Sequence, residues 1–146
     1  MITECPQKEY HRPNYYLINA EGKTLGRLAS LSTKLLMGKE TSYYMPSINQ
    51  GNYVTIINAE KIVISGKKNT QKIYYRNSQR PGSLKQENFQ QLHQRLPARI
   101  VEKAIWGMLP KGLQGRNYYH RLYVFAKEPL LKRSTLTPTQ NWIFIK

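Results

Sequence analysis

The chain has 146 residues and a formal net charge of +15, because 23 Lys and Arg residues stand against only eight acidic residues, all of them Glu. The absence of Asp excludes Asp-dependent catalytic triads and Asp-based magnesium or calcium sites, and a single cysteine, Cys5, excludes an internal disulfide. So large an excess of positive charge repels itself unless a polyanion neutralises it, which favours nucleic acid as the partner.

The first 13 residues form a polar extension. They contain two prolines and no hydrophobic periodicity, so we expect them to be ordered only against a partner. They also include Glu4 and Glu9 and lack an apolar stretch, which argues against a secretory signal and against a transit peptide. No later apolar run is long enough to span a bilayer, so we expect no membrane partner.

Strand and helix patterns then alternate along the chain. Tyr15–Asn19 is an apolar run of strand length. Thr24 is placed to begin a helix and Gly38 to end it. The apolar residues of this helix share one face: Leu25, Leu28, Ala29, Leu35 and Leu36. Tyr53–Ile57, rich in β-branched residues, predicts a second and central strand, so the chain opens with a βαβ unit.

A strongly basic stretch follows, which we interpret as a long RNA-binding loop. It contains no acidic residue, and its cations are Lys67, Lys68, Lys72, Arg76, Arg80 and Lys85. They are interleaved with Tyr74, Tyr75, Pro81 and Gly82. Consecutive residues of an extended chain point to opposite sides. One of the two tyrosines is therefore expected in the core and the other is available to stack on a base.

The next predicted elements are helical. Residues 87–95 show a weak helical pattern with Phe89 and Leu92 facing inward. A stronger helix is predicted from Pro97 to Leu109, where Pro110 ends it. Its apolar stripe is formed by Ile100, Val101, Ala104, Ile105, Met108 and Leu109. Arg99, Glu102 and Lys103 fall on the other face. Trp106 and Met108 are expected along the inner helix region, where they pack in the core or in a groove.

After this helix we predict a cationic glycine loop. Gly112 and Gly115 let the backbone approach a partner closely, and Lys111 and Arg116 flank them. A further helical turn between residues 113 and 121 is an alternative for part of this loop. Residues 122–126 are predicted to form a short buried strand. The terminal apolar run of residues 142–145 also requires burial.

Alternating strands and helices predict a single α/β domain over residues 1–146, a size that needs no metal or disulfide to hold its core. We expect a three-layer α/β/α sandwich around a mostly parallel sheet, with long basic loops and an extended tail over residues 127–146.

Three features favour RNA over an ordinary solvated surface. Residues 61–127 carry 14 Lys and Arg against two Glu, the cations lie in Gly- and Pro-containing loops as well as on helices, and Tyr or His residues neighbour them. The charge pattern adds Arg95, Arg99 and Arg121 to the expected RNA-binding residues.

The glycine and histidine residues of the sequence do not have the spacing that enzyme motifs require. Gly22-Lys23-Thr24 is similar to the end of a P-loop, but Leu17 stands where the first glycine of that motif must be. The three histidines are scattered and lack a partner four residues away, so we predict no metal site, and no cofactor is expected. A small nucleotide-dependent or RNA-modifying α/β enzyme, and a translational repressor that binds messenger RNA, remain alternative functions.

Several blocks of the sequence, all in the family's order, resemble the large-subunit ribosomal protein L13 family over residues 15–126. They include residues 107–111 (GMLPK), Gly115-Arg116 and residues 122–125 (LYVF), with residues 22–30 (GKTLGRLAS) and 57–62 (INAEKI) upstream. Asn77 and Gln79 depart from the family, which commonly has His and Gly there.

The resemblance implies a four-stranded sheet and a structural, non-enzymatic constituent of the ribosome. Such a protein would bind folded 23S-type rRNA, act early in subunit assembly and lie beside other large-subunit proteins. Carried over by position, the resemblance places these residues at or near RNA: Lys67, Lys72, Tyr75, Arg76, Pro81, Gly82, Lys85, Lys111, Gly115 and Arg116. The richness in Lys, Asn, Ile and Tyr is typical of an AT-rich genome such as a plastid's, with a bacterial cytoplasm as the alternative.

Overall fold

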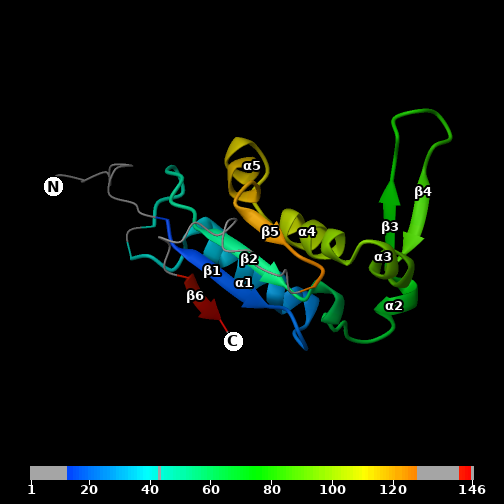
Figure 1. Ribbon diagram of the computed structural model, residues 1–146. Helices are drawn as coiled ribbons and strands as arrows, with labels where there is room; N and C mark the ends of the chain where they lie inside the picture. The colour runs from blue at the N-terminus through cyan, green and yellow to red at the C-terminus, as the bar shows by residue number, and fades with distance from the viewer. Residues whose placement is uncertain (1–12, 43, 128–141, 146) are drawn as a thin grey trace.

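The computed structural model of the protein describes residues 13–42, 44–127 and 142–145. Its main sheet has four strands in the order β5-β2-β1-β6, and every neighbouring pair is parallel (Figure 1). The strands are β1 (Tyr15–Asn19), β2 (Tyr53–Ile57), β5 (Leu122–Val124) and β6 (Trp142–Ile145). The predicted α/β fold around a mostly parallel four-stranded sheet is confirmed, and the arrangement is consistent with a three-layer sandwich.

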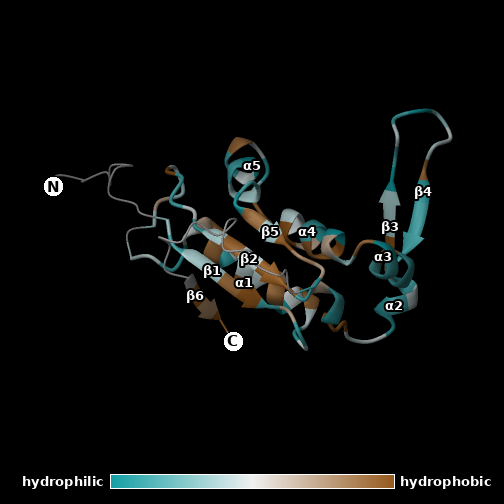
Figure 2. Ribbon diagram, viewed as in Figure 1, coloured by the Kyte–Doolittle hydropathy of each residue, from teal (hydrophilic) through white to brown (hydrophobic). Residues whose placement is uncertain are grey.

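The core lies between the central strands and two helices, α1 (Leu25–Met37) and α4 (Pro97–Met108). Burial alternates along β1, whereas residues 54–57 of β2 are all buried, and Ile18 and Ile56 at the centre are fully buried. Figure 2 shows the hydrophobic residues concentrated in these elements. Burial of apolar surface between the helices and the sheet is therefore the main force that holds the fold together.

The ends of α1 follow their sequence signals. Gly38 adopts the left-handed conformation, with φ of 74°, and its N–H donates to the Leu35 carbonyl at 3.0 Å. The Lys39 N–H donates to the Lys34 carbonyl at 3.1 Å, so two carbonyls of the last turn are satisfied. Thr24 occupies the N-cap position as predicted, although its side chain makes no capping hydrogen bond.

Helix α4 also begins and ends as predicted, and the Leu109 N–H still donates to the Ile105 carbonyl at 3.0 Å. Two residues correct the predicted orientation. Met108 is 46% exposed and lines a surface hollow beside Leu25 and Lys72, because no described element covers the last turn on that side. Trp106 is 45% exposed and faces away from the core.

The predicted long basic loop is instead a short helix and a two-stranded antiparallel hairpin. The elements are α2 (Lys68–Gln71), β3 (Ile73–Arg76), β4 (Lys85–Asn88) and α3 (Phe89–Arg95). The hairpin projects away from the main sheet, beyond α3 and α4 (Figure 1). Helix α3 starts two residues later than predicted because Asn88 forms a capping box with Gln91.

The hairpin shows which of the two neighbouring tyrosines faces inward. Tyr74 is half-buried and packs against the core, whereas Tyr75 is 58% exposed. The opposite directions of consecutive side chains in a strand are therefore confirmed.

The predicted glycine loop is shorter than expected, because α5 (Leu113–Tyr119) begins directly after Gly112. Gly115 lies inside this helix and is buried. A Cβ atom there would collide with the Pro110 carbonyl oxygen. The alternative of a further helical turn is thus correct, and Gly115 is required for close packing of the helix on the preceding turn.

The two edge strands are more exposed than predicted. Among the strands that the structure describes, β5 pairs with β2 alone, and Tyr123 at its centre is 49% exposed, so the expected buried strand is wrong. Residues 142–145 lie within the predicted tail but pair with β1 as β6. The burial expected for this run is wrong for Phe144, which is 73% exposed on β6, the last strand in the order of the main sheet. None of the helices in the described ranges is both long and apolar enough to cross a membrane.

Candidate nucleic-acid interface

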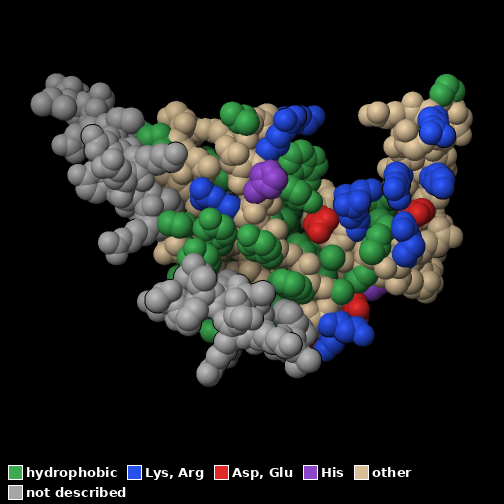
Figure 3. Space-filling model, turned by 45° about the horizontal axis from the view of Figure 1, so that its top comes forward, with side chains coloured by type: hydrophobic (Ala, Val, Ile, Leu, Met, Phe, Trp, Pro, Cys, Tyr) green, Lys and Arg blue, Asp and Glu red, His purple; other side chains and the backbone are tan. Residues whose placement is uncertain are grey.

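The predicted RNA-binding cations lie on the hairpin, on the helices at its base, and around α5. All are exposed except Lys72 and Arg121, which are half-buried. Figure 3 shows Lys and Arg side chains gathered on the hairpin and at its base, beside a hollow that separates the hairpin from the rest of the molecule. The structure thus brings Arg76 together with Arg95 and Arg99, although these residues are distant in the sequence. Lys85 pairs with Arg76 across the hairpin.

The hairpin turn is held by short polar contacts. The Ser83 hydroxyl lies 2.7 Å from both the Asn77 side-chain oxygen and the Arg80 carbonyl oxygen. The Gln79 N–H donates to the Asn77 side chain at 2.9 Å. Gln79 and Gly82 both adopt positive φ, of 66° and 73°. These contacts fold the turn so that Arg80, Pro81 and Gly82 lie at its exposed tip.

Gln79 adopts a left-handed backbone conformation that glycine enters without strain and that other residues adopt less readily.

A groove of about 300 Å³ separates the hairpin from α4. The hairpin, α3, α4 and α5 all contribute to its lining: Tyr74, Arg76, Glu87, Leu92, Arg95, Leu96, Arg99, Glu102, Lys103, Trp106 and Tyr119. We call this lining the α4 groove. It combines four cations, two carboxylates and a wall of aromatic and aliphatic side chains, which is a mixture suited to a polar ligand with an apolar face.

The charges of the α4 groove are only partly paired. Arg95 donates two hydrogen bonds of 2.7 Å to the Glu87 carboxylate, and Arg99 lies 3.9 Å from Glu102. Arg76 and Lys103 form no ion pair with any described residue. The groove therefore keeps positive charge available for an anionic partner.

Tyr74 of the α4 groove interacts with Lys103 of the groove and with Lys72, which lies outside the groove lining. The Lys103 and Lys72 amino nitrogens lie 5.2 Å and 5.4 Å from the centroid of the Tyr74 ring, within the range of cation–π attraction. Burial raises the pKa of the Tyr74 hydroxyl. Burial, and then the negative charge of Glu102, raise the pKa of Tyr119. Both hydroxyls are therefore neutral near pH 7 and able to donate hydrogen bonds.

Two predicted RNA-binding residues have internal contacts of their own. The Arg121 guanidinium donates to the Gly51 carbonyl and lies 5.5 Å from the Tyr53 ring centroid. Gly115 is buried beneath Pro110. Lys111 and Arg116, by contrast, are exposed at the start and on the surface of α5. An RNA contact of Arg121 or Gly115 stays a prediction, and both residues have a structural reason to be present.

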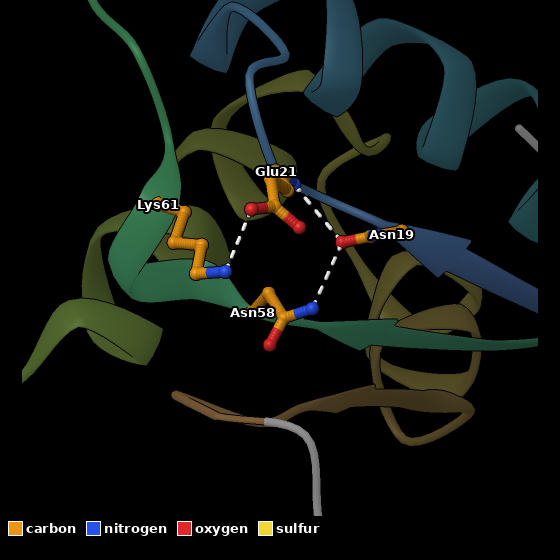
Figure 4. Close-up of polar contacts among 4 residues, drawn as sticks. All are labelled: Asn19, Glu21, Asn58 and Lys61. Atoms are coloured by element: carbon orange, nitrogen blue, oxygen red, sulfur yellow. Dashed lines mark hydrogen bonds and ion pairs between the residues drawn. The ribbon is translucent and has the colours of Figure 1, made fainter.

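Polar residues at the carboxyl ends of β1 and β2 form a structural clamp with the short 3-10 helix η2 (Ala59–Lys61) (Figure 4). The Lys61 amino nitrogen lies 2.6 Å from Glu21, and this hydrogen bond lowers the pKa of the Glu21 carboxyl. Asn58 donates to Asn19 at 3.1 Å. These contacts hold the strand ends to each other and do not assemble a nucleophile with a base. Within the described ranges no group of three or more His, Cys, Asp or Glu is placed to hold a metal ion.

Sequence reasoning missed Trp106, Lys103 and Tyr119 as residues of the groove. A signal was present, because Arg99, Glu102, Lys103 and Trp106 follow the spacing i, i+3, i+4 and i+7 of a second helical face. Placing Trp106 along the inner region of the helix concealed that face.

Comparison with known proteins places the chain in a family. The model of a family described as ribosomal protein L13 matches residues 13–130. The large ribosomal subunit protein uL13 of Synechococcus sp. (strain JA-3-3Ab) is 48% identical over 124 residues, which cover 85% of this chain and 82% of the relative. The proteins of the same name from Trichormus variabilis and Trichodesmium erythraeum are 46% and 43% identical over 85% and 84% of this chain, and over 82% of each relative. With matches over most of its length, the chain belongs to the ribosomal protein L13 family.

Proposed function

We propose that this protein is a structural constituent of the large ribosomal subunit that binds and stabilises folded 23S-type rRNA, and that it acts early in subunit assembly. The observation that carries the proposal is the projecting hairpin, on which Arg76, Arg80 and Lys85 are exposed and form no ion pair with described residues. Family membership supports a place in the large subunit and a structural, non-enzymatic role.

The binding mode follows from the type of cation and its position. Arg pairs with phosphate through two parallel hydrogen bonds and stacks on bases, whereas Lys acts as a point charge. A narrow basic hairpin reaches phosphates on more than one segment of folded RNA, which favours recognition of shape and backbone over base edges. Lys67, Lys68 and Lys72 at the hairpin base, and Lys111 and Arg116 near α5, extend this proposed interface.

Neighbouring large-subunit proteins are the further partners that we propose. The relatives are cyanobacterial, which is consistent with a ribosome of the plastid stroma, our preferred location, and with one of the bacterial cytoplasm. Co-sedimentation of the tagged protein with large subunits in moderate salt tests this assignment. A protein found only on messenger RNA would contradict it.

The hairpin is tested by the double substitution Arg76→Ala and Arg80→Ala. We expect weaker binding to purified large-subunit rRNA in a filter-binding assay. The slope of log affinity against log salt should become shallower by about 2, because two phosphate contacts are lost. Thermal stability should not fall, since both side chains are exposed and unpaired within the described chain.

A charge-matched control is Lys34→Ala with Lys39→Ala at the end of α1, away from the hairpin (Figure 1). This variant also loses two positive charges and should keep most of the affinity and the salt slope. Equal losses in the two double variants would mean that total charge, and not the hairpin, determines binding. Unchanged affinity in the Arg variant would remove the hairpin from the interface.

A further inference from the structure

We propose that the α4 groove binds a single base that folded rRNA turns out of its stack, and that Trp106 is the surface on which this base stacks. The inference rests on the proposed function and specifies the chemistry of one part of the interface. Phosphate contacts require only cations and hydrogen-bond donors, so they do not account for the apolar wall of the groove. A stacked base does.

Trp106 is exposed and held in one orientation. The indole is 45% exposed although the core lies on the other side of α4. Its orientation is fixed by Tyr119, whose ring centroid lies 5.0 Å away at an interplanar angle of 70°. Leu96, also exposed, lies in the same groove. A fixed aromatic ring open to solvent in a groove is the kind of surface on which an unpaired base stacks.

The charged residues of the α4 groove include carboxylates as well as cations. A channel for phosphates alone would gain nothing from carboxylates, yet Glu87 and Glu102 both line the groove. Arg95 and Arg99 hold these carboxylates, and the resulting pairs present both donors and acceptors. Base edges carry both kinds of group, whereas a phosphate only accepts hydrogen bonds. The mixture therefore fits a base better than a phosphate.

Two cations of the α4 groove are placed to bind the phosphates beside an extruded base. Arg76 on the hairpin and Lys103 on α4 both line the groove and lack ion-pair partners among the described residues. An extruded base brings its flanking phosphates with it, and these require cations beside the pocket. The groove volume of about 300 Å³ lies at the lower end of ligand pockets, roughly 300–1,000 Å³, and suits one base and not a helix.

The test compares substitutions of Trp106 in the full-length protein with purified large-subunit rRNA as the probe. Trp106→Leu should weaken binding by about 5- to 150-fold, the range expected for loss of one base–aromatic stack. The salt slope should stay the same, because no charge is removed. Trp106→Phe should retain most of the affinity, since an aromatic face remains. Melting temperatures of both variants, measured alongside, identify any loss of affinity that comes from misfolding.

Met108→Leu is the matched control, because Met108 has nearly the same exposure on the same helix but lines a different hollow. It should bind rRNA as the wild type does. If the Trp106→Leu variant bound rRNA with wild-type affinity, the proposal would be overturned. It would also be overturned if this substitution weakened binding to a peptide and left binding to rRNA unchanged. If the wild-type protein itself showed no salt-dependent rRNA binding, the proposed function would fail, which is a distinct result.

Fluorescence gives a direct readout. The chain has two tryptophans, so Trp142→Phe leaves Trp106 as the only one. Stacking of a base on the indole should quench its emission as rRNA is added. Binding without any change in this emission would show that no base lies on Trp106.

Discussion

At the scale of single residues, two glycines near the end of α4 have opposite environments. Gly115 is buried in α5 with its Cα facing the Pro110 carbonyl, so there is no room for a side chain. Gly107 lies in the last turn of α4, and a Cβ added there meets no atom within 4 Å. One glycine is required by packing, whereas the other only adds flexibility to the unfolded chain.

We therefore expect Gly115→Ala to destabilise the protein by about 1–3 kcal/mol, the usual cost of inserting a methyl group where backbone must move. Gly107→Ala should stabilise it by about 0.4–1 kcal/mol, because alanine favours the helix and restricts the unfolded state. Urea denaturation of both variants measures the two changes in the free energy of unfolding. Equal effects of the same sign would contradict the packing role of Gly115.

At the scale of elements, the hairpin depends on the side to which each tyrosine points. Tyr74 packs against the core between Lys72 and Lys103, whereas Tyr75 faces solvent from the same strand. The inner tyrosine thus anchors the hairpin to the helices, and the outer one is available to the RNA that we propose.

This division predicts different results from two neighbouring substitutions. Tyr74→Ala should lower the free energy of unfolding by roughly 1–2 kcal/mol, since part of the ring and its cation–π contacts are lost. Tyr75→Ala should leave stability unchanged and weaken rRNA binding alone. Thermal denaturation and filter binding on both variants separate the effects. A stability loss in Tyr75→Ala as large as that in Tyr74→Ala would show that the hairpin is anchored differently.

The sequence predicts the central elements well, because strong local signals agree there. Helix α1 has five apolar residues on one face and Gly38 at its end, and α4 is bounded by Pro97 and Pro110. The hairpin escaped prediction because β4 (Lys85–Asn88) contains no apolar residue, so its pairing with β3 leaves no alternating pattern. Such a strand is specified by its partner and not by its own residues.

The candidate interface was predictable only in part. Charge counting located the cations, because positive residues without nearby acids are visible in the sequence. The α4 groove was not predictable in the same way, since Arg76, Arg99 and Tyr119 meet only after α4 and the hairpin have packed. The number of residues between two positions in the sequence does not show how close they lie in the folded protein.

At the scale of the whole molecule, the net charge of +15 opposes folding while it promotes RNA binding. Within the described ranges four ion pairs form, and each involves an exposed cation: Lys34–Glu40, Lys61–Glu21, Arg95–Glu87 and Arg99–Glu102. Surface pairs of this kind contribute little to stability, typically about 0–1 kcal/mol each. Repulsion among the remaining cations is therefore the dominant electrostatic effect in the free protein.

Salt should consequently change stability and affinity in opposite directions. Raising NaCl from about 50 mM to about 500 mM shortens the Debye length to a few ångströms and screens the repulsion, so the melting temperature of the free protein should rise. Over the narrower range of about 50–200 mM, rRNA affinity should fall by roughly three decades if about six phosphates are contacted. Calorimetry of the free protein and filter binding in the same buffers measure both trends. A melting temperature that falls with NaCl would mean that the four surface pairs outweigh the repulsion. The double variant Arg76→Ala and Arg80→Ala, which carries less charge, should gain less from salt than the wild type, because fewer repelling cations remain to be screened.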